Sequence, residues 1–415
     1  MQTITQNSSS QTNPPRGRCD QTRVLFMTDA FLPHAGGARV YYYNLFREWT
    51  RYSGNHVTVL TKKVPGWEGF DSTQSNDEFR IVRSGRPLPS WKYQEWPKIA
   101  LPFVNATSLL LRNRFDLIHF GDLYPQGVLS LWFKRLSGKP YVAYCHGEEI
   151  TQTDGRRFQP KVRNAIFREA SMVVAASEFA RQNLLRIGID PGRIRKITPG
   201  VDCERFQPVA PRPDLVERHE LIGKTVLLTV ARLVPRKGHR LILEALRQLV
   251  REVPNIVYLI VGTGPEQDHL RRLVGEWSLN DVVRFVGFVP DDDLPSYYNL
   301  ADLYVMPNSE ENGDIEGFGM VFLEANACGI PVIGGRSGGA AEAVLHGKTG
   351  MLVDPHDAGE LASAIGMLID NRSKRQELGA FGLSRARREF SWASRGVALE
   401  DVNRQIMAGA EFRLA

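Results

Sequence analysis

The chain has 415 residues, of which 42% are apolar and 24% are charged, as is typical of a soluble globular protein with more than one domain. The longest apolar run, 99–111, is interrupted by Pro102, Asn105 and Ser108 and falls short of the roughly 18 residues that a membrane span needs. The four cysteines are widely scattered, without the spacing of a zinc site or a disulfide framework. We therefore expect a cytoplasmic protein with reduced thiols.

The net charge of +6 is distributed unevenly along the chain. Through Pro199, 28 Lys and Arg stand against 16 Asp and Glu, giving +12, whereas from Gly200 onward 24 stand against 30, giving −6. A basic amino-terminal half suits an acidic acceptor or an anionic membrane surface, and solvated surface charge explains it equally well. Nucleic acid is not an expected partner, because the basic residues are dispersed and not interleaved with aromatic ones.

The chain begins with residues 1–21, whose many polar residues and prolines predict a disordered tail rather than a signal peptide. Short β-rich runs then alternate with helical segments, which is typical of a doubly wound parallel sheet. The expected strands are 24–28, 56–60, 116–120, 141–144 and 172–175, with helices such as 38–51 and 127–136 between them. This pattern predicts a Rossmann-like domain over residues 22–199.

A proline-rich stretch near residues 198–213 breaks the periodicity and predicts a linker. The alternation then restarts. The expected strands are 225–230, 256–261, 282–285, 302–306 and 331–333, and the expected helices begin near residues 238, 265, 292, 319 and 339. We therefore expect a second doubly wound domain over residues 200–389, facing the first across a cleft that the carboxyl ends of both sets of strands line.

The segment Glu316-Gly317-Phe318-Gly319 leads into an apolar run that carries Glu324. Its glycines predict a helix N-terminus, where free N–H groups and the helix dipole attract a phosphate. The two glutamates lie on either side of this turn and can accept hydrogen bonds from hydroxyls at opposite ends of one elongated ligand. A sugar nucleotide has this layout.

Two other short motifs fit the same ligand. Gly36 and Gly37 follow the first expected strand, where their amides can meet a diphosphate, although a plain turn is the alternative. Arg232 and Lys237 flank a strand-to-helix loop, where positive charge can stabilise a departing diphosphate without a metal. Solvated surface charge is the alternative for this pair.

In this order and spacing, the motifs resemble those of the retaining glycosyltransferases of family 4, which have the GT-B fold. The resemblance covers about residues 22–410. It implies an α/β protein with two Rossmann-like domains that face a central cleft, and a carboxyl-terminal helix within 390–415 that returns to the first domain. It also implies that the first domain binds the acceptor and the second the nucleotide sugar.

The resemblance assigns roles to individual residues. Glu316 is expected to contact hydroxyls of the donor sugar, Glu324 the ribose, and Arg232 and Lys237 the diphosphate. His146 matches the family's His-Gly pattern, which implies contact with the hydroxymethyl end of the donor sugar. His146, Glu316, Arg232 and Lys237 are therefore the expected catalytic residues.

Two turns complete the expected donor site. Gly262 begins a tight turn that is expected to line the nucleotide pocket, and Phe288 belongs to a segment whose backbone the family uses to bind the base. The run Asp291-Asp292-Asp293 predicts a helix cap rather than a metal site. Because the GT-B family works without a bound metal, we expect no metal and no cofactor.

The expected reaction transfers a hexose, with retained anomeric configuration, from a nucleotide-diphosphate sugar to a hydroxyl of a glycan or lipid-linked acceptor. The insertion 310–315 resembles mannosyltransferases and slightly favours GDP-mannose, with a UDP-glucose-dependent glucosyltransferase as the alternative. A sugar-nucleotide epimerase, a phosphorylase and a non-catalytic nucleotide-sugar binder stay open. Trp91, Tyr93 and Trp96 are expected to meet a lipid interface, stack on a sugar or pack internally, so peripheral contact with the inner face of the cell membrane is also open.

Overall fold

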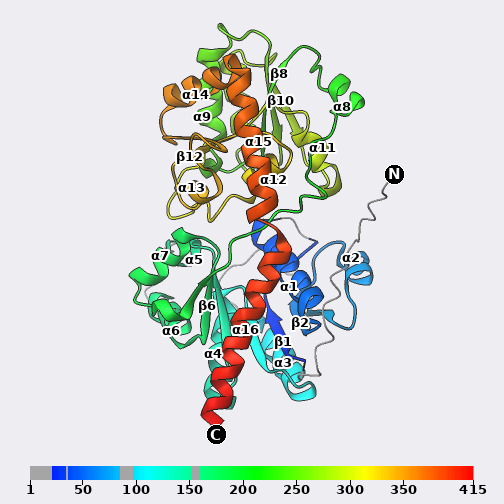
Figure 1. Cartoon of the computed structure of the whole chain (residues 1–415), viewed down its shortest axis with the longest axis vertical. Helices are drawn as coiled ribbons and strands as arrows, with labels where there is room; N and C mark the ends of the chain where they lie inside the picture. Colours follow the sequence, from blue (N-terminus) through cyan, green and yellow to red (C-terminus); the bar gives the residue numbers. More distant parts are fainter. Residues whose placement is uncertain (1–20, 34–35, 85–96, 152–158, 415) are drawn as a thin grey trace, which may run out of the picture.

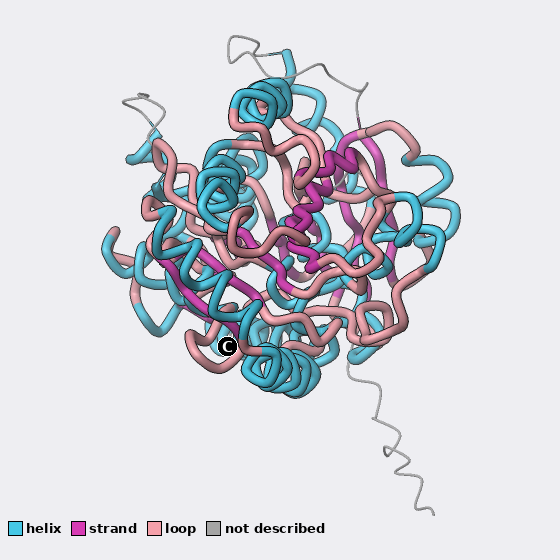
Figure 2. Tube along the Cα trace, turned by 90° about the horizontal axis from the view of Figure 1, so that it is seen from above, coloured by secondary structure: helices cyan, strands magenta, loops and turns pink. Residues whose placement is uncertain are grey.

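The computed structural model describes residues 21–33, 36–84, 97–151 and 159–414. They form two domains that follow one another along the long axis of the molecule (Figure 1). Seen along that axis, the strands lie inside and the helices surround them (Figure 2). Almost all of the predicted tail, and the aromatic residues of segment 91–96, lie outside the described residues.

The first domain contains a seven-stranded parallel sheet with the order β3-β2-β1-β4-β5-β6-β7. Its strands are β1 (Arg23–Met27), β2 (His56–Lys62), β3 (Phe79–Ser84), β4 (Leu117–Phe120), β5 (Tyr141–Cys145), β6 (Met172–Ala175) and β7 (Ile194–Lys196). Its helical segments are α1 (Gly37–Ser53), α2 (Trp67–Gln74), α3 (Pro97–Arg112), η1 (Leu123–Gly127), α4 (Val128–Ser137), α5 (Glu148–Thr151), α6 (Gln159–Glu169), α7 (Glu178–Arg186), η2 (Pro191–Arg193) and α16 (Trp392–Leu414).

The second domain contains a six-stranded parallel sheet with the order β10-β9-β8-β11-β12-β13. Its strands are β8 (Thr225–Val230), β9 (Ile256–Val261), β10 (Val283–Gly287), β11 (Leu303–Met306), β12 (Val332–Gly335) and β13 (Gly350–Val353). Its helical segments are α8 (Pro213–Arg218), η3 (Pro235–Lys237), α9 (His239–Leu249), α10 (Gln267–Glu276), η4 (Asp291–Asp293), α11 (Leu294–Tyr298), α12 (Met320–Ala327), α13 (Ala340–Ala343), α14 (Ala358–Asp370) and α15 (Arg372–Glu389).

Both sheets reverse their strand order at one point. The reversal falls between β1 and β4 in the first domain and between β8 and β11 in the second. Open α/β sheets bind ligands at the carboxyl ends of the strands beside such a point. The segments that follow these four strands are therefore the ones that the fold brings to the cleft.

Aromatic packing fixes the orientation of α1 in the first domain. Tyr42, Phe46 and Trp49 recur at helical spacing and are almost fully buried. The ring of Phe26 in β1 lies 4.4 Å from that of Phe46 and 5.0 Å from that of Tyr42, measured between centroids. Because α1 is held against the sheet by these large side chains, its N-terminus at Gly37 keeps a defined place at the cleft.

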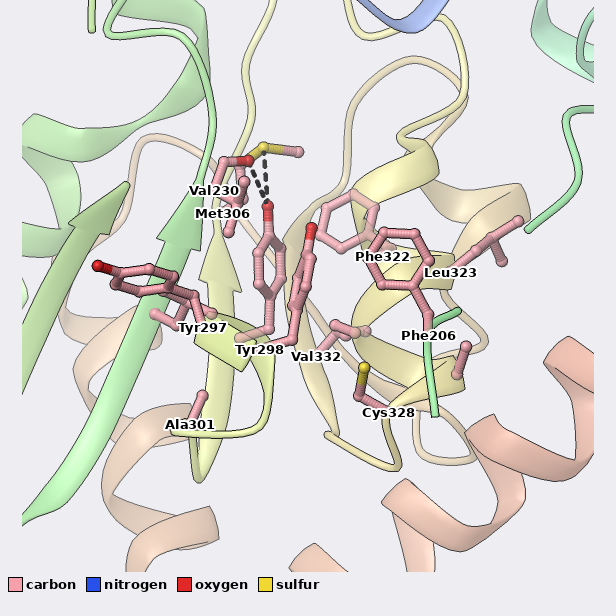
Figure 3. Close-up of a cluster of buried hydrophobic side chains, with 14 of the residues drawn as sticks. Phe206, Val230, Tyr297, Tyr298, Ala301, Met306, Phe322, Leu323, Cys328 and Val332 are labelled. Atoms are coloured by element: carbon pink, nitrogen blue, oxygen red, sulfur yellow. Dashed lines mark hydrogen bonds between the residues drawn. The ribbon is translucent and has the colours of Figure 1, made fainter. Parts of the chain in front are cut away.

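A second aromatic cluster supports α12 in the other domain (Figure 3). Tyr304 packs edge-on against Phe322 of α12, with 5.7 Å between ring centroids. Its hydroxyl donates to Val230 O at 3.2 Å and lies 3.7 Å from Met306 Sδ. The buried ring thus ties α12 to strands β8 and β11, whose carboxyl ends border the cleft.

The chain crosses between the domains twice, and the two crossings lie side by side. Val201 N–H donates to Phe390 O at 2.8 Å, and Val201 forms a parallel bridge with Ser391. After this point α16 packs along α1, on the first domain (Figure 1). Glu400 of α16 accepts hydrogen bonds from Trp49 Nε1 and Asn55 Nδ2, both at 2.9 Å.

The sequence pattern missed β3, β7 and β13, and each of these strands lies at an edge of its sheet. Edge strands have one paired neighbour and are incompletely buried, so they carry short and weakly alternating patterns. In β7 only Ile194 is buried, whereas Arg195 and Lys196 are exposed. Incomplete burial thus accounts for β3 and β7, whereas three of the four residues of β13 are buried.

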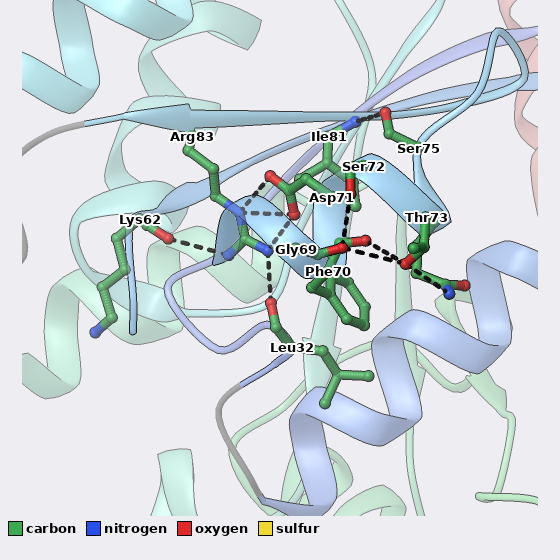
Figure 4. A network of polar contacts seen from close by, with 11 residues as sticks. Leu32, Lys62, Gly69, Phe70, Asp71, Ser72, Thr73, Ser75, Ile81 and Arg83 are labelled. Atoms are coloured by element: carbon green, nitrogen blue, oxygen red, sulfur yellow. Dashed lines mark hydrogen bonds and ion pairs between the residues drawn. The ribbon is translucent and has the colours of Figure 1, made fainter. Parts of the chain in front are cut away.

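The edge strand β3 also braces the loop that follows β1 (Figure 4). The Arg83 side chain is almost fully buried and pairs with Asp71 of α2, with 2.7 Å between Nη2 and Oδ1. The same guanidinium donates to Leu32 O at 2.6 Å and to Lys62 O at 3.1 Å. This network attaches the loop between β1 and α1 to the rest of the sheet.

Candidate active site

The carboxylate of Glu316 lies between two cations from the loop after β8. Lys237 Nζ donates directly to Glu316 Oε2, and Arg236 Nη1 donates to the same oxygen at 2.7 Å. Burial raises the pKa of Glu316, but the two cations outweigh this effect and hold that pKa at about 2. Glu316 is therefore an anion at neutral pH and can accept hydrogen bonds from ligand hydroxyls.

Arg236 also connects Glu316 to the insertion at 310–315. Its Nε lies 2.9 Å from Asp314 Oδ1 as an ion pair without the alignment of a hydrogen bond. Asn312 and Gly313 have positive φ values of 53° and 80°, which make the insertion a tight turn. Because Thr151 Oγ1 donates to Gly313 O at 2.8 Å, this turn touches the first domain.

The turn before α12 has the geometry that the glycines predicted. Gly319, the N-cap of α12, has a left-handed φ of 87°. A Cβ added to Gly317 would lie only 2.7 Å from His146 O of the first domain, so glycine permits the close approach of the two domains here. Phe318 is 4% exposed and packs near Phe390, so only its backbone can face a donor.

Glu324, one turn further along α12, has a different environment from Glu316. Its Oε2 accepts a hydrogen bond of 2.6 Å from the Tyr298 hydroxyl. Burial raises the pKa of Glu324, and the Tyr298 hydrogen bond opposes that shift. The two glutamates therefore lie at opposite ends of the turn, one held by cations and the other by a phenol.

The glycine pair after β1 faces the N-terminus of α12 across the cleft. Gly36 has a φ of 149°, and Gly37 is the first residue of α1. A Cβ added to Gly37 would lie 4.0 Å from Sδ of Met320, the first residue of α12. Two helix N-termini thus converge on one region, which is a favourable place for an anion.

A cation that the sequence analysis did not assign lies in the first turn of α1. The Arg39 pKa is lowered, first by burial and also by the positive charge of Arg232, while Asp122 opposes the shift. Arg232 itself is exposed at the carboxyl end of β8. The only sequence signal for Arg39 was a basic residue two positions after a glycine pair.

His146 follows β5 and is packed by two tyrosines. Its ring lies 5.3 Å from the ring of Tyr41 and 5.4 Å from that of Tyr42, measured between centroids. Burial lowers the His146 pKa, so the imidazole is neutral. The Tyr42 hydroxyl lies 2.8 Å from Nε2 and donates to Gly121 O, which assigns the proton to Nε2 and leaves Nδ1 as an acceptor.

Cys145, next to His146, lacks the environment of a nucleophile. Burial raises the pKa of its thiol, and the negative charge of Glu149 raises it further. Glu149 accepts the N–H groups of His146 and Gly147, each at 2.9 Å, so its carboxylate stabilises its own loop.

At the turn expected to line the nucleotide pocket, the ends of β8, β9 and β10 lie close together. Gly262 has a φ of 130°, and a Cβ there would collide with Ala231 O. Its N–H donates to Gly287 O at 2.7 Å. Phe288 follows directly and is 71% exposed, so its ring lies at the surface.

Of the aspartates at 291–293, Asp293 is the N-cap residue of α11, so the predicted helix cap is found in position but without a side-chain hydrogen bond. The three aspartates together form η4. Asp291 lies 3.7 Å from Arg205, and Asp293 lies 3.1 Å from Arg212. Within the part of the chain that the structure describes, no group of three or more His, Cys, Asp or Glu residues is arranged to hold a metal ion.

Comparison with known proteins agrees with this architecture. The family model described as Glycosyltransferase Family 4 matches residues 35–205, and the one described as Glycosyl transferases group 1 matches residues 213–385. The fold and the site thus define a glycosyltransferase of the GT-B class. The chain belongs to glycosyltransferase family 4, as the sequence motifs predicted, and is a hexosyltransferase that uses a nucleotide sugar.

Among its relatives is the GDP-mannose-dependent alpha-(1-6)-phosphatidylinositol monomannoside mannosyltransferase of Mycolicibacterium smegmatis. It is 32% identical over 388 residues, which cover 91% of this chain and 97% of that protein. The D-inositol 3-phosphate glycosyltransferase 2 of Catenulispora acidiphila is 36% identical over 311 residues, or 69% of this chain and 70% of that protein.

Solved structures share the whole fold. Sucrose-phosphate synthase from Thermosynechococcus elongatus superposes with a TM-score of 0.79 at 26% identity, covering 94% of this chain and all of that one. Anabaena HepE in complex with UDP and glucose superposes with a TM-score of 0.76 at 21% identity, covering 93% of this chain and all of that one. At this identity, HepE supports the fold alone.

No helix within residues 21–33, 36–84, 97–151 and 159–414 is both long and apolar enough to cross a membrane.

Proposed function

We propose that the chain is a retaining, metal-independent mannosyltransferase that moves mannose from GDP-mannose to a hydroxyl of an inositol-containing lipid. The acceptor and donor follow the names of the relatives, which act with GDP-mannose on phosphatidylinositol monomannoside. The single observation that carries the mechanism is the ionised Glu316, held by Lys237 and Arg236 beside two converging helix N-termini.

In this proposal, the donor diphosphate binds where the N-termini of α1 and α12 converge. The amides near Gly37 and Gly319 and the positive charges of Arg232 and Lys237 stabilise the negative charge that develops on the leaving group. Two of these groups are fixed before the reaction, since Lys237 is buried and Gly319 is a helix cap. Their combined effect replaces a metal ion in the proposed mechanism.

Glu316 binds hydroxyls of the donor sugar rather than attacking the anomeric carbon. A carboxylate with a pKa near 2 and two cations on one oxygen is a weak nucleophile. We therefore propose that the acceptor hydroxyl attacks from the face that the diphosphate leaves. The departing diphosphate takes the acceptor proton, and the new glycosidic bond retains the anomeric configuration.

Contact with a membrane is a second part of the proposal. Leu111 of α3 and Leu136 of α4 are each about four-fifths exposed, and Trp132 of α4 is 55% exposed. Arg112 adds positive charge beside Leu111, whereas Arg135 beside Leu136 is paired with Glu169. Exposed apolar side chains beside cations favour a peripheral position on an anionic lipid surface.

The test is a panel of GDP-, UDP- and ADP-sugars, measured by thermal shift and by release of nucleotide, with and without EDTA. We expect GDP-mannose to give the largest shift and to be slowly hydrolysed at a rate that EDTA does not change. A preference for UDP-glucose would overturn the donor assignment, and loss of turnover in EDTA would overturn metal independence.

Adding phosphatidylinositol mannoside to the same assay separates the remaining alternatives. A transferase should release GDP faster and form an α-linked product, which NMR of the anomeric proton identifies. A β-linked product would contradict retention. An epimerase would convert GDP-mannose alone into another sugar nucleotide, and a phosphorylase would require free phosphate.

A further inference from the structure

A contact between the domains lies outside the donor pocket, on the short helix α13. Glu342 Oε2 accepts the N–H of Glu178, the first residue of α7, at 2.5 Å. Its Oε1 accepts a hydrogen bond from Lys196 Nζ, at the end of β7, at 2.7 Å. Figure 1 shows α13 on the side of the second domain that faces α7. One carboxylate of the second domain thus holds two groups of the first.

Both groups that contact Glu342 favour a negative charge on its carboxylate. The N-terminus of α7 has the positive end of a helix dipole, and Lys196 adds a full charge. Glu178 is a second and more distant partner of Lys196, because its carboxylate lies 3.7 Å from Lys196 Nζ and also accepts a hydrogen bond from Arg181 at 2.9 Å. The negative charge of Glu342 therefore faces two positively polarised groups of the first domain, the N-terminus of α7 and Lys196.

The other side of α13 supports the donor loop directly. Gly339, the N-cap of α13, donates its N–H to Glu316 O at 2.8 Å. A Cβ at Gly338 would collide with Glu316 O, and one at Gly339 would collide with Gly317 O. Since backbone packs on backbone without an intervening side chain, a shift of α13 moves the loop that carries Glu316.

The carboxyl end of α13 is attached to the crossing between the domains. Arg385, which is 7% exposed in α15, donates to Ala343 O at 2.7 Å and to Glu342 O at 3.0 Å. Its guanidinium also lies 4.7 Å from the ring centroid of Phe390, where the chain crosses. Thus α13 connects the crossing, the first domain and the donor loop.

We propose that Glu342 is a positioning residue for sugar transfer. When Lys196 and the N-terminus of α7 engage Glu342, the turn at 338–339 holds Glu316 and Gly317 in the arrangement that binds the donor sugar. This inference rests on the proposed function, because it assigns to Glu342 the orientation of the glutamate that contacts that sugar. Glu342 itself touches no substrate.

The test compares Glu342→Gln, Lys196→Met and the double variant. The rate of hydrolysis of GDP-mannose, or of the sugar nucleotide that the donor panel selects, measures how well the donor sugar is positioned. Binding of the matching nucleoside diphosphate reports on the nucleotide site without the sugar. We expect kcat for hydrolysis to fall about tenfold in each single variant and no further in the double variant, because both changes remove the same Glu342–Lys196 ion pair. Affinity for the diphosphate should change less than about twofold.

Two controls separate positioning from simple stability. Lys196→Arg should retain near wild-type kcat, since it keeps the charge. Glu360→Gln removes a partly exposed glutamate that pairs with Arg336 at 2.8 Å and should leave kcat unchanged. Equal losses of turnover and diphosphate affinity, additive losses in the double variant, or wild-type turnover in Glu342→Gln would each overturn the proposal. A wild-type protein that neither binds nor hydrolyses any sugar nucleotide would instead refute the proposed function.

Discussion

The two domains have the same layered architecture but present different chemistry to the cleft. The second domain contributes largely buried charges that neutralise one another, with the partly buried Glu316 between Lys237 and Arg236. The first contributes a neutral imidazole, His146, packed among tyrosine rings. One half of the site is thus organised by electrostatics and the other by aromatic packing. Changes to the charged half should therefore affect chemistry, whereas changes to the aromatic half should affect stability.

The largest effect is expected from Lys237→Met. This change removes one of the two cations on Glu316 and a positive charge that we assign to the leaving diphosphate. By analogy with the loss of one preorganised donor, kcat should fall by about 10²- to 10³-fold. The affinity for GDP should fall much less. Steady-state kinetics and calorimetric titration with GDP measure the two quantities.

Arg240→Met is the matched control for that variant. Arg240 lies three residues further along, is exposed, and pairs with Glu244 at 3.0 Å. Its removal should leave kcat within about twofold of the wild type. If Lys237→Met weakened GDP binding as much as turnover, its role would be ground-state binding alone.

The next largest effect is expected on stability, in the first domain, which is organised by aromatic packing. Glu400→Ala removes the acceptor of Trp49 Nε1 and Asn55 Nδ2, both of which are buried. Two unsatisfied buried donors should lower the free energy of unfolding by about 2–4 kcal/mol. Urea denaturation followed by tryptophan fluorescence measures this loss. Asp401→Ala, at an exposed position of the same helix, should change stability by less than about 0.5 kcal/mol.

An intermediate effect on kcat is expected from a change at Gly317, where the second domain contacts the first. In Gly317→Ala the new Cβ would lie 2.7 Å from His146 O, so the domains could not approach as closely. We expect kcat to fall about tenfold with little change in melting temperature, which corresponds to about 1.4 kcal/mol in the activation free energy. Gly275→Ala in α10 meets no atom within 4 Å and serves as the control. Full activity of Gly317→Ala would show that transfer does not need this approach.

The smallest effect is expected from Arg336→Ala. Its guanidinium pairs with Glu360 at 2.8 Å and donates to Leu352 O, although its loop borders the donor segment. A half-exposed ion pair contributes at most about 1 kcal/mol, so kcat/KM should change less than about twofold. A larger loss of kcat/KM would indicate that Arg336 contacts the donor and belongs to the charged part of the site.

Sequence reasoning found most of the charged half because its parts are local in sequence. Lys237 follows β8 by seven residues, and Glu316, Gly319 and Glu324 belong to one turn and one helix. Glycine and charge patterns at strand ends carry this information. Assigning Phe318 as a donor contact was less informative, because its burial depends on Phe390 from a distant part of the chain.

The residues that sequence reasoning missed depend on tertiary contacts. Arg236 received no role from its sequence, because its partners Glu316 and Asp314 lie about 80 residues further along the chain. Glu342 is one acidic residue on a four-residue helix, and its partners lie about 150 residues earlier in the chain. No local pattern marks such a pair, since only the docking of two domains creates it.

The return of α16 to the first domain also has a consequence for synthesis of the protein. Residues 23–196 supply the whole first sheet, yet Trp49 and Asn55 receive their buried acceptor from Glu400, near the end of the chain. A nascent chain therefore carries an unfinished first domain while the second is being translated. We expect synthesis of α16, rather than emergence of the first sheet, to complete the amino-terminal half.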